Sequence, residues 1–209
     1  MHNEATAFGT AAVVEGLATR GWVCLDGFLD EAAARSLAEE SLHAWEDGDF
    51  RRAGVGRGAE RVIREDVRRD HVLWLGDETT GPAAKQYLAR LEALRQEINR
   101  ACFLGLFDFE GHFAVYPPGA FYKAHLDRHR GTADRVVTAI LYLNDGWQPG
   151  DGGRLRIWTE PGRQDGPCEW IEPRLGTLVV FLAGDYWHEV EEARKTRMSV
   201  TGWFRTRGL

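Results

Sequence analysis

The chain has 209 residues, of which 44% are hydrophobic and 28% are charged. This composition is typical of a soluble globular protein and excludes a wholly disordered chain. The length suits one domain, since chains usually divide only beyond roughly 250–300 residues. The net charge of −6 disfavours a general nucleic-acid binder, which would usually present a basic face.

No targeting or membrane segment is indicated by the hydropathy. Residues 1–5 lack the basic start of a secretory signal, and the most apolar run, residues 178–183, is far shorter than the roughly 20 residues of a membrane span. Cys24, Cys102 and Cys168 lie far apart, and their odd number argues against a disulfide framework or a zinc ribbon. We therefore expect unpaired, buried cysteines in a cytoplasmic protein that binds neither nucleic acid nor a membrane.

The N-terminal part of the chain is predicted to contain two helices and a short strand. Apolar residues at helical spacing predict a helix over residues 10–20, which Gly21 ends. Residues 22–25 are a short apolar run, which predicts a strand. Asp30 is placed to cap a second helix that continues to about residue 47.

Residues 51–69 differ from the segments around them. They hold three glycines and many arginines, with little apolar periodicity. The pattern predicts a loop or a short ribbon, and two interpretations of it are open. It is either a solvated charged loop or a mobile lid over a substrate site.

A third helix is predicted to begin at Pro82 and to continue to Cys102. Proline suits the first turn of a helix, and apolar residues recur at every third or fourth position through the segment. We expect the helices to cover one face of a sheet.

From residue 111 onward the pattern changes to strands. Short apolar runs are separated by Gly, Pro, Asp and Asn, which is typical of a jelly roll or a related barrel. The eight predicted strands cover residues 112–116, 121–127, 136–143, 154–158, 169–172, 177–182, 188–191 and 198–204. We expect one domain over residues 1–209, mainly β, with helical support and a substrate loop in 1–110 and the β core in 111–209.

A His-x-Asp pair, His125 and Asp127, lies on one of these strands. Residues two apart on a strand point to the same face, so an imidazole and a carboxylate can converge on one metal ion. His188 follows 61 residues after Asp127 on a later predicted strand. Two His and one carboxylate form the facial triad of non-haem Fe(II) oxygenases, which leaves metal positions open. The pair alone is a weak signal, because a lone His on a strand is more often a core residue than a ligand.

Arg197 begins a strand that has a second chemical feature. Alternation places Arg197, Ser199, Thr201 and Trp203 on one face. If that face points into the barrel, the guanidinium is buried and needs an anionic partner, which a dicarboxylate would supply through a bidentate pair. Tyr142 could donate its hydroxyl to the same carboxylate. The alternative interpretation of Arg197 is a surface salt bridge with a glutamate such as Glu191 or Glu192.

Taken in order, these residues resemble the prolyl 4-hydroxylase branch of the 2-oxoglutarate and Fe(II) oxygenase superfamily. The resemblance covers about ninety residues, from Tyr116 to Phe204. Its motifs are Tyr116-Pro117-Pro118-Gly119, Tyr122, His125-Leu126-Asp127, Arg135, Tyr142-Leu143-Asn144 with Trp147, Gly152-Gly153-Arg154-Leu155-Arg156-Ile157, His188-Glu189-Val190 and Arg197. Upstream, residues 68–74 resemble the segment after the mobile substrate loop of the oxygen-sensing prolyl hydroxylases and their bacterial relatives. The loop after Asp127 departs from the pattern by being unusually basic, and its His129 is expected not to be a ligand.

The resemblance implies a double-stranded β-helix, cupin-like, packed on supporting helices, with Fe(II) held by His125, Asp127 and His188. It also implies 2-oxoglutarate and O2 as co-substrates, oxidation of the former to succinate and CO2, and ascorbate as a further cofactor. The residues implied to bind 2-oxoglutarate are Arg197, Tyr142 and Thr201.

The implied substrate is a prolyl residue in a protein or peptide. Tyr116 is expected near the mouth of the pocket, and Arg135 and Trp203 against the substrate. Each of the three has an alternative: the two aromatic residues would simply pack, and Arg135 would pair with Asp134 or another nearby acid.

Other functions stay open on the sequence. The same scaffold could hydroxylate a free amino acid or another small molecule. A non-catalytic metal-binding sensor domain would use the triad but has no need of Arg197. A zinc hydrolase is a weaker alternative, because no glutamate is placed as an obvious general base. The oligomeric state is not indicated.

Overall fold

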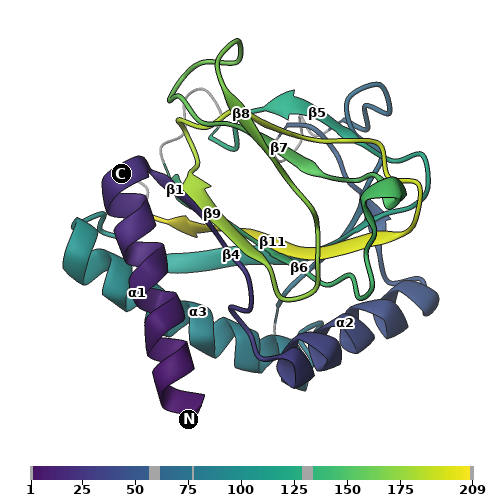
Figure 1. Cartoon of the computed structure of the whole chain (residues 1–209). Coiled ribbons are helices and arrows are strands. Elements are labelled where there is room, and N and C mark those ends of the chain that lie inside the picture. Colours follow the sequence, from purple (N-terminus) through teal and green to yellow (C-terminus); the bar gives the residue numbers. More distant parts are fainter. Residues whose placement is uncertain (1, 57–61, 77, 129–133, 208–209) are drawn as a thin grey trace.

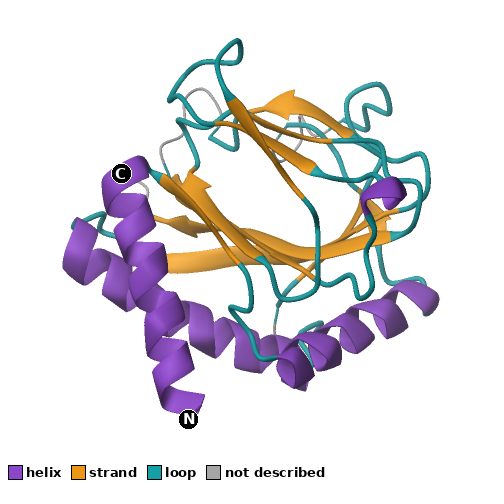
Figure 2. Ribbon diagram, in the orientation of Figure 1, coloured by secondary structure: helices purple, strands orange, loops and turns teal. Residues whose placement is uncertain are grey.

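The computed structural model describes residues 2–56, 62–76, 78–128 and 134–207; for residues 2–8 only the backbone is described. The α-helices lie on one side of the molecule and the sheets on the other, as Figures 1 and 2 show. The helices are α1 His2–Arg20, α2 Glu31–Glu46 and α3 Pro82–Cys102. All three were predicted, although α1 begins earlier than residue 10.

The helix starts have clear local causes. Asp30 accepts a hydrogen bond from the Ala33 backbone N–H at 2.8 Å, so it is the N-cap of α2 as expected. At α3, the Glu40 carboxylate accepts from the backbone N–H groups of Gly81, Ala83 and Ala84 at 2.9–3.3 Å. This carboxylate from α2 satisfies donors that the first turn of α3 leaves free.

The larger sheet is seven-stranded in the order β1-β9-β6-β11-β4-β3-β2, and the smaller is four-stranded in the order β5-β10-β7-β8. The larger sheet is made of β1 Trp22–Leu25, β2 Arg51–Arg52, β3 His71–Trp74, β4 Asp108–Tyr116, β6 Arg135–Tyr142, β9 Leu178–Leu182 and β11 Arg197–Arg205. The smaller is made of β5 Tyr122–His125, β7 Leu155–Trp158, β8 Cys168–Ile171 and β10 His188–Val190.

The prediction of a mainly β jelly roll with N-terminal helices is confirmed. The eight strands predicted from residue 111 onward and the strand at 22–25 are all present, whereas β2 and β3 were missed. Every strand pair in both sheets is antiparallel. β11 lies between β4 and β6 at the centre of the larger sheet, where Arg197 pairs with Tyr116 and Ser199 with Tyr142.

Two apolar cores follow from this layering. One lies between the helices and the larger sheet and includes Leu37, Leu94 and Phe204, all fully buried. The other lies between the two sheets and includes Tyr142 and Ile157. The helices cover one face of the larger sheet and the smaller sheet lies over the other, so the second core is the space inside the roll (Figure 2).

The three cysteines are free thiols, as predicted. The expectation that all are buried is wrong: Cys24 is exposed on β1, an edge strand, and Cys102 and Cys168 are half-buried. Within the described residues, no helix is long and apolar enough to cross a membrane.

Candidate active site

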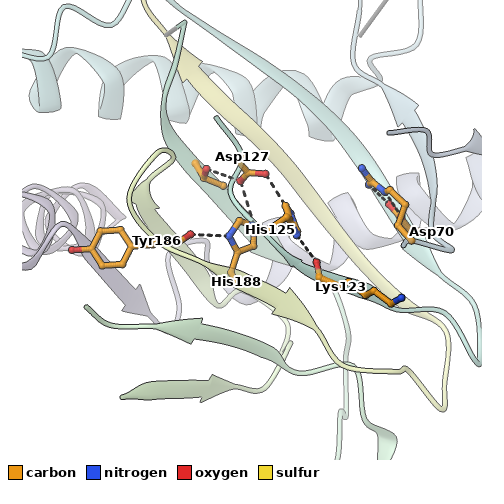
Figure 3. Close-up of polar contacts among 8 residues, drawn as sticks. Asp70, Lys123, His125, Asp127, Tyr186 and His188 are labelled. Atoms are coloured by element: carbon orange, nitrogen blue, oxygen red, sulfur yellow. Dashed lines mark hydrogen bonds and ion pairs between the residues drawn. The ribbon is translucent and has the colours of Figure 1, made fainter. Parts of the chain in front are cut away.

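Strand pairing in the smaller sheet brings the predicted metal ligands together. His125 ends β5 and His188 begins β10, and the two residues are register partners in the antiparallel pair. Asp127 follows β5 by two residues. One ligand atom from each of the three side chains lies within 4.8 Å of the other two, and Figure 3 shows the side chains turned toward one another.

Each imidazole is oriented by the carbonyl oxygen of the residue two positions earlier. His125 Nδ1 lies 2.8 Å from the Lys123 carbonyl oxygen, and His188 Nδ1 lies 3.1 Å from that of Tyr186. A carbonyl oxygen only accepts, so each Nδ1–H donates and each Nε2 is left with its lone pair free. The two Nε2 atoms lie 3.6 and 3.5 Å from the Asp127 carboxylate. Such carbonyl partners fix the tautomer of metal-binding histidines.

Asp127 is held as an ionised carboxylate although it is buried. Burial opposes its ionisation, but His188, His125 and the hydroxyl of Thr138 together hold the pKa of Asp127 well below its usual range. Thr138 donates to Asp127 Oδ2 at 2.8 Å. Burial, followed by the neighbouring His125, lowers the pKa of His188 to about 4. At neutral pH the site therefore offers the neutral imidazole of His188 and the carboxylate of Asp127.

A cavity of about 470 Å³ lies beside the triad, and all three side chains line it. Two nitrogens and one oxygen on one side of an open cavity are the donor set of a non-haem Fe(II) site with positions left for other ligands. Within the described chain, the only glutamate that lines the cavity is Glu110. It is ion-paired with Arg135 and Arg205 at 3.0 and 3.1 Å, so it is not a free general base of the kind that a zinc hydrolase needs.

Arg197 lines the same cavity and has an unusual environment. Its side chain is 1% exposed, its Nε donates to the Gly153 carbonyl oxygen at 2.8 Å, and its guanidinium lies against the rings of Tyr116 and Tyr142 at 4.7 and 4.9 Å. Within the described residues no carboxylate lies within ion-pair distance of it. The alternative of a surface pair with Glu191 or Glu192 is wrong, because Arg197 is buried and Glu191 binds Arg154 instead.

Tyr142 and Thr201 lie differently. Tyr142 is fully buried, its hydroxyl has no hydrogen-bond partner among the described residues, and burial raises its pKa. It contacts the Arg197 guanidinium but does not itself line the cavity. Thr201 does line the cavity, with its hydroxyl 3.3 Å from that of Ser199. The buried cation and the orphaned hydroxyl beside it fit an anionic ligand with hydrogen-bond acceptors.

The three predicted substrate residues all line the cavity. Tyr116 packs on Arg197, while Arg135 lies over the ring of Trp203 at 3.4 Å and pairs with Glu110 at 3.0 Å. The Trp203 indole N–H is buried and has no partner in the part of the chain that the structure describes. Arg135 therefore does pair with an acid, but with Glu110 on β4, on the far side of β11, rather than with Asp134.

Several lining residues were not singled out from the sequence. His112 lies between Trp74 and Trp203, with ring centroids 4.8 and 5.6 Å away, and burial lowers its pKa to about 3. Tyr122 was noted in a motif but given no role, and Arg68 was only part of a resembling segment. Alternation along residues 112–116 could have placed His112 on the same face as Tyr116. His129 lies outside the described residues.

The comparisons with known proteins identify the family. Residues 111–205 match the model of the 2OG-Fe(II) oxygenase superfamily. A crystal structure of a Pseudomonas putida prolyl-4-hydroxylase is 46% identical to this chain, with a TM-score of 0.85, and covers 95% of this chain and 99% of that one. The chain belongs to the prolyl 4-hydroxylase family of the 2OG-Fe(II) oxygenases. The resemblance drawn from residues 116–204 is confirmed, and Fe(II), 2-oxoglutarate and O2 are the cofactor and co-substrates of this oxygenase.

Two further relatives align over nearly the whole chain. A Trichoplax adhaerens prolyl hydroxylase, solved in complex with a peptide fragment of the hypoxia-inducible factor, is 26% identical with a TM-score of 0.82, covering 97% of this chain and 91% of that one. Human Egl nine homolog 1 is 28% identical over 92% of this chain. The oxygenase spans only 45% of the length of the human protein.

Proposed function

We propose that this oxygenase hydroxylates a prolyl residue in a protein or peptide, with succinate and CO2 as co-products. The observation that carries the proposal is the cavity itself: the triad and the buried Arg197, which no carboxylate of the described residues accompanies, share one space. The 46% identity to a Pseudomonas prolyl-4-hydroxylase supports the choice of a prolyl substrate.

In the proposal, each residue of the site has a defined role. Fe(II) would be held by His125, Asp127 and His188. Once Fe(II) and 2-oxoglutarate are both bound, the metal would supply the activation of O2. Arg197 pairs with the distal carboxylate of 2-oxoglutarate, since a buried guanidinium needs such an anion. Tyr142 and Thr201 donate their hydroxyls toward the same carboxylate.

The substrate side of the cavity is formed by Tyr116, Arg135 and Trp203, with the unpartnered Trp203 indole N–H as a donor for a peptide carbonyl. The segment 51–69 forms the lid. Its residues 53–56 line the cavity, and Val55 and Val62 form an antiparallel bridge; residues 57–61 lie outside the described chain. The arginines of the segment favour an acidic target.

The cavity favours a peptide over a free amino acid. A free amino acid needs charged partners for both its ammonium and its carboxylate. Besides Arg197, the described arginines that line the cavity are Arg68 and Arg135, and each is already paired with an acid, Asp70 and Glu110 respectively. An uncharged prolyl residue within a chain needs no such partner.

The test is a hydroxylation screen under ¹⁸O2. Purified protein with Fe(II) and 2-oxoglutarate is given either a protein extract or a panel of free amino acids, and products are read by mass spectrometry. We expect ¹⁸O on proline in a protein, and none with the His125→Ala variant. Label on a free amino acid alone would assign the small-molecule function, and no turnover of 2-oxoglutarate with any substrate would assign a sensor domain.

Deleting residues 54–63 tests the lid. We expect hydroxylation of the protein substrate to fall, while slow oxidation of 2-oxoglutarate without substrate persists. Unchanged hydroxylation would remove the lid role from the proposal.

The proposal extends to the setting of the enzyme. It includes one oxygenase domain over residues 1–209, a cytoplasmic location, no nucleic-acid or membrane partner, and ascorbate as a cofactor that sustains turnover. Omitting ascorbate in the screen tests the last point, since we expect successive turnovers to decline without it.

A further inference from the structure

A continuous stack of side chains joins the base of the lid to one metal ligand. Arg68 lies over the ring of Tyr122, with its guanidinium carbon 4.1 Å from the ring centre. The same ring is stacked on the imidazole of His125, with ring centres 3.6 Å apart and planes within 17°. Two groups so close to one ring centre cannot share a face, so Arg68 and His125 lie on opposite faces of Tyr122.

The outer end of the stack is anchored by a buried ion pair. Arg68 donates through Nε and Nη2 to both carboxylate oxygens of Asp70, at 2.7 and 2.5 Å. The Asp70 side chain is fully buried and that of Arg68 is 14% exposed. A bidentate pair fixes the plane of a guanidinium as well as its position, so the orientation of Arg68 over Tyr122 is set before any ligand binds.

Backbone hydrogen bonds also join these two segments, residues 67–70 and 122–125. The Lys123 N–H donates to the Val67 carbonyl oxygen at 2.9 Å, and the Lys123 carbonyl oxygen accepts from His125 Nδ1 at 2.8 Å. Arg68 also forms an isolated bridge with Tyr122. Both the ring plane and the tautomer of His125 are therefore fixed by groups that touch residues 67–70.

We propose that Arg68 and Tyr122 are positioning residues that couple the segment 64–70, at the base of the lid, to the metal ligand His125. The inference rests on the proposed function of the triad. It means that the placement of the lid base sets the orientation of His125, so a substrate held under the lid alters the metal site without touching the metal. Groups that orient a metal-binding histidine typically change metal affinity by roughly 10–100-fold when removed.

The chain offers a matched control next to the stack. The guanidinium carbon of Arg69 lies 4.9 Å from the ring centre of Phe121, and the backbone N–H of Arg69 donates to the Phe121 carbonyl oxygen at 3.0 Å. This pair joins the same two segments with the same chemistry, but within the described residues neither side chain stacks on a triad residue. Changes there test the structural connection without the contact to His125.

The experiment measures anaerobic Fe(II) affinity, the visible charge-transfer band formed on adding 2-oxoglutarate, and thermal stability. We expect Tyr122→Leu to weaken Fe(II) binding by about tenfold or more and to shift the band, whereas Tyr122→Phe keeps the ring and both readings. Arg68→Lys keeps the charge but not the planar group, so it shifts both readings in the same direction by less. Phe121→Leu and Arg69→Lys should leave both unchanged, whatever they do to the melting temperature.

The coupling would be overturned if Tyr122→Leu and Arg68→Lys kept the Fe(II) affinity and the charge-transfer band of the wild type. An equal loss of Fe(II) affinity in Phe121→Leu would overturn it as well. If Tyr122→Leu does not fold, Arg68→Lys against Arg69→Lys decides the question. A wild-type protein that binds Fe(II) but gives no band with 2-oxoglutarate would instead overturn the proposed function, and the Fe(II) affinities of the variants would still decide the coupling.

Discussion

The two faces of the central strands β6 and β11 differ sharply. On the helix side, Val137, Leu141 and Phe204 are fully buried among apolar neighbours. On the side facing the smaller sheet, the same strands carry groups that an ordinary core excludes, among them Arg197 and Tyr142. Adjacent residues of one strand therefore lie in different environments, because successive side chains on a strand point to opposite faces of the sheet.

The difference separates stability from function within one sheet. The helix side is stabilised by the burial of apolar surface, which is the dominant favourable term in folding. The inner side holds buried polar atoms that find no partner within the described chain, including the Tyr142 hydroxyl and the Trp203 indole N–H. Each such group costs stability until a ligand pairs with it. We therefore expect changes on the helix side to affect folding and changes on the inner side to affect ligands.

The largest expected effect on the inner side is from His188. Replacing it by Ala removes one of the three proposed metal ligands, so 2-oxoglutarate oxidation should fall below detection while the protein stays folded, as measured by succinate release and circular dichroism. Glu189→Gln is the neighbouring control on β10, since Glu189 pairs with Arg156 away from the cavity. Activity retained in His188→Ala would contradict the assignment of the triad.

On the helix side, Phe204→Ala should cost about 3–5 kcal/mol of unfolding free energy, because it leaves a cavity in a close-packed core. Phe204 is fully buried and its ring centre lies 5.0 Å from that of Phe109. Its neighbour Trp203, on the other face, should tolerate replacement by Phe with far less loss. Urea unfolding measures the free energy of unfolding of both variants. An equal loss at the two positions would contradict the view that the helix side serves folding and the inner side serves ligands.

Arg197→Met should weaken 2-oxoglutarate binding by roughly 100-fold, about 2.7 kcal/mol, because in the proposal the distal carboxylate loses its buried partner. Without 2-oxoglutarate the variant should melt no lower than wild type, since an apolar residue replaces a buried charge. Melting curves with and without 2-oxoglutarate separate the two effects. Arg154→Met is the control, as Arg154 pairs with Glu191 and does not line the cavity. A lower melting temperature of Arg197→Met in the absence of ligand would show that Arg197 serves the fold.

The smallest effect is expected from Glu40→Gln, far from the cavity. The carboxylate caps α3 by accepting from three backbone N–H groups, so its neutral amide should cost about 1 kcal/mol. That corresponds to a melting temperature lower by roughly 2–4 °C, with 2-oxoglutarate oxidation unchanged. The exposed neighbour Glu39→Gln should change neither, and a loss of activity in Glu40→Gln would mean that the helix layer does influence the site.

Local patterns were sufficient for most of the fold. The helix from Pro82 to Cys102 and the eight strands from residue 111 onward followed from periodicity and turn residues, which depend on neighbours along the chain. β3 was missed because its four residues, His71–Trp74, show no clear alternation, and it becomes a strand by pairing with β4. The exposure of Cys24 was missed for a similar reason, since it depends on β1 being an edge strand.

The sequence by itself determined which residue types are available for chemistry and which of them share a strand face. The two-residue spacing of His125 and Asp127 and the alternation from Arg197 to Trp203 are properties of any extended chain. Only the tertiary structure decided which partners these residues meet: that His188 pairs in register with His125, that Arg197 has no carboxylate of the described residues beside it, and that Arg68 reaches His125 through Tyr122. Those contacts join segments far apart along the chain, and they depend on sheet register and layer packing, which no local pattern specifies.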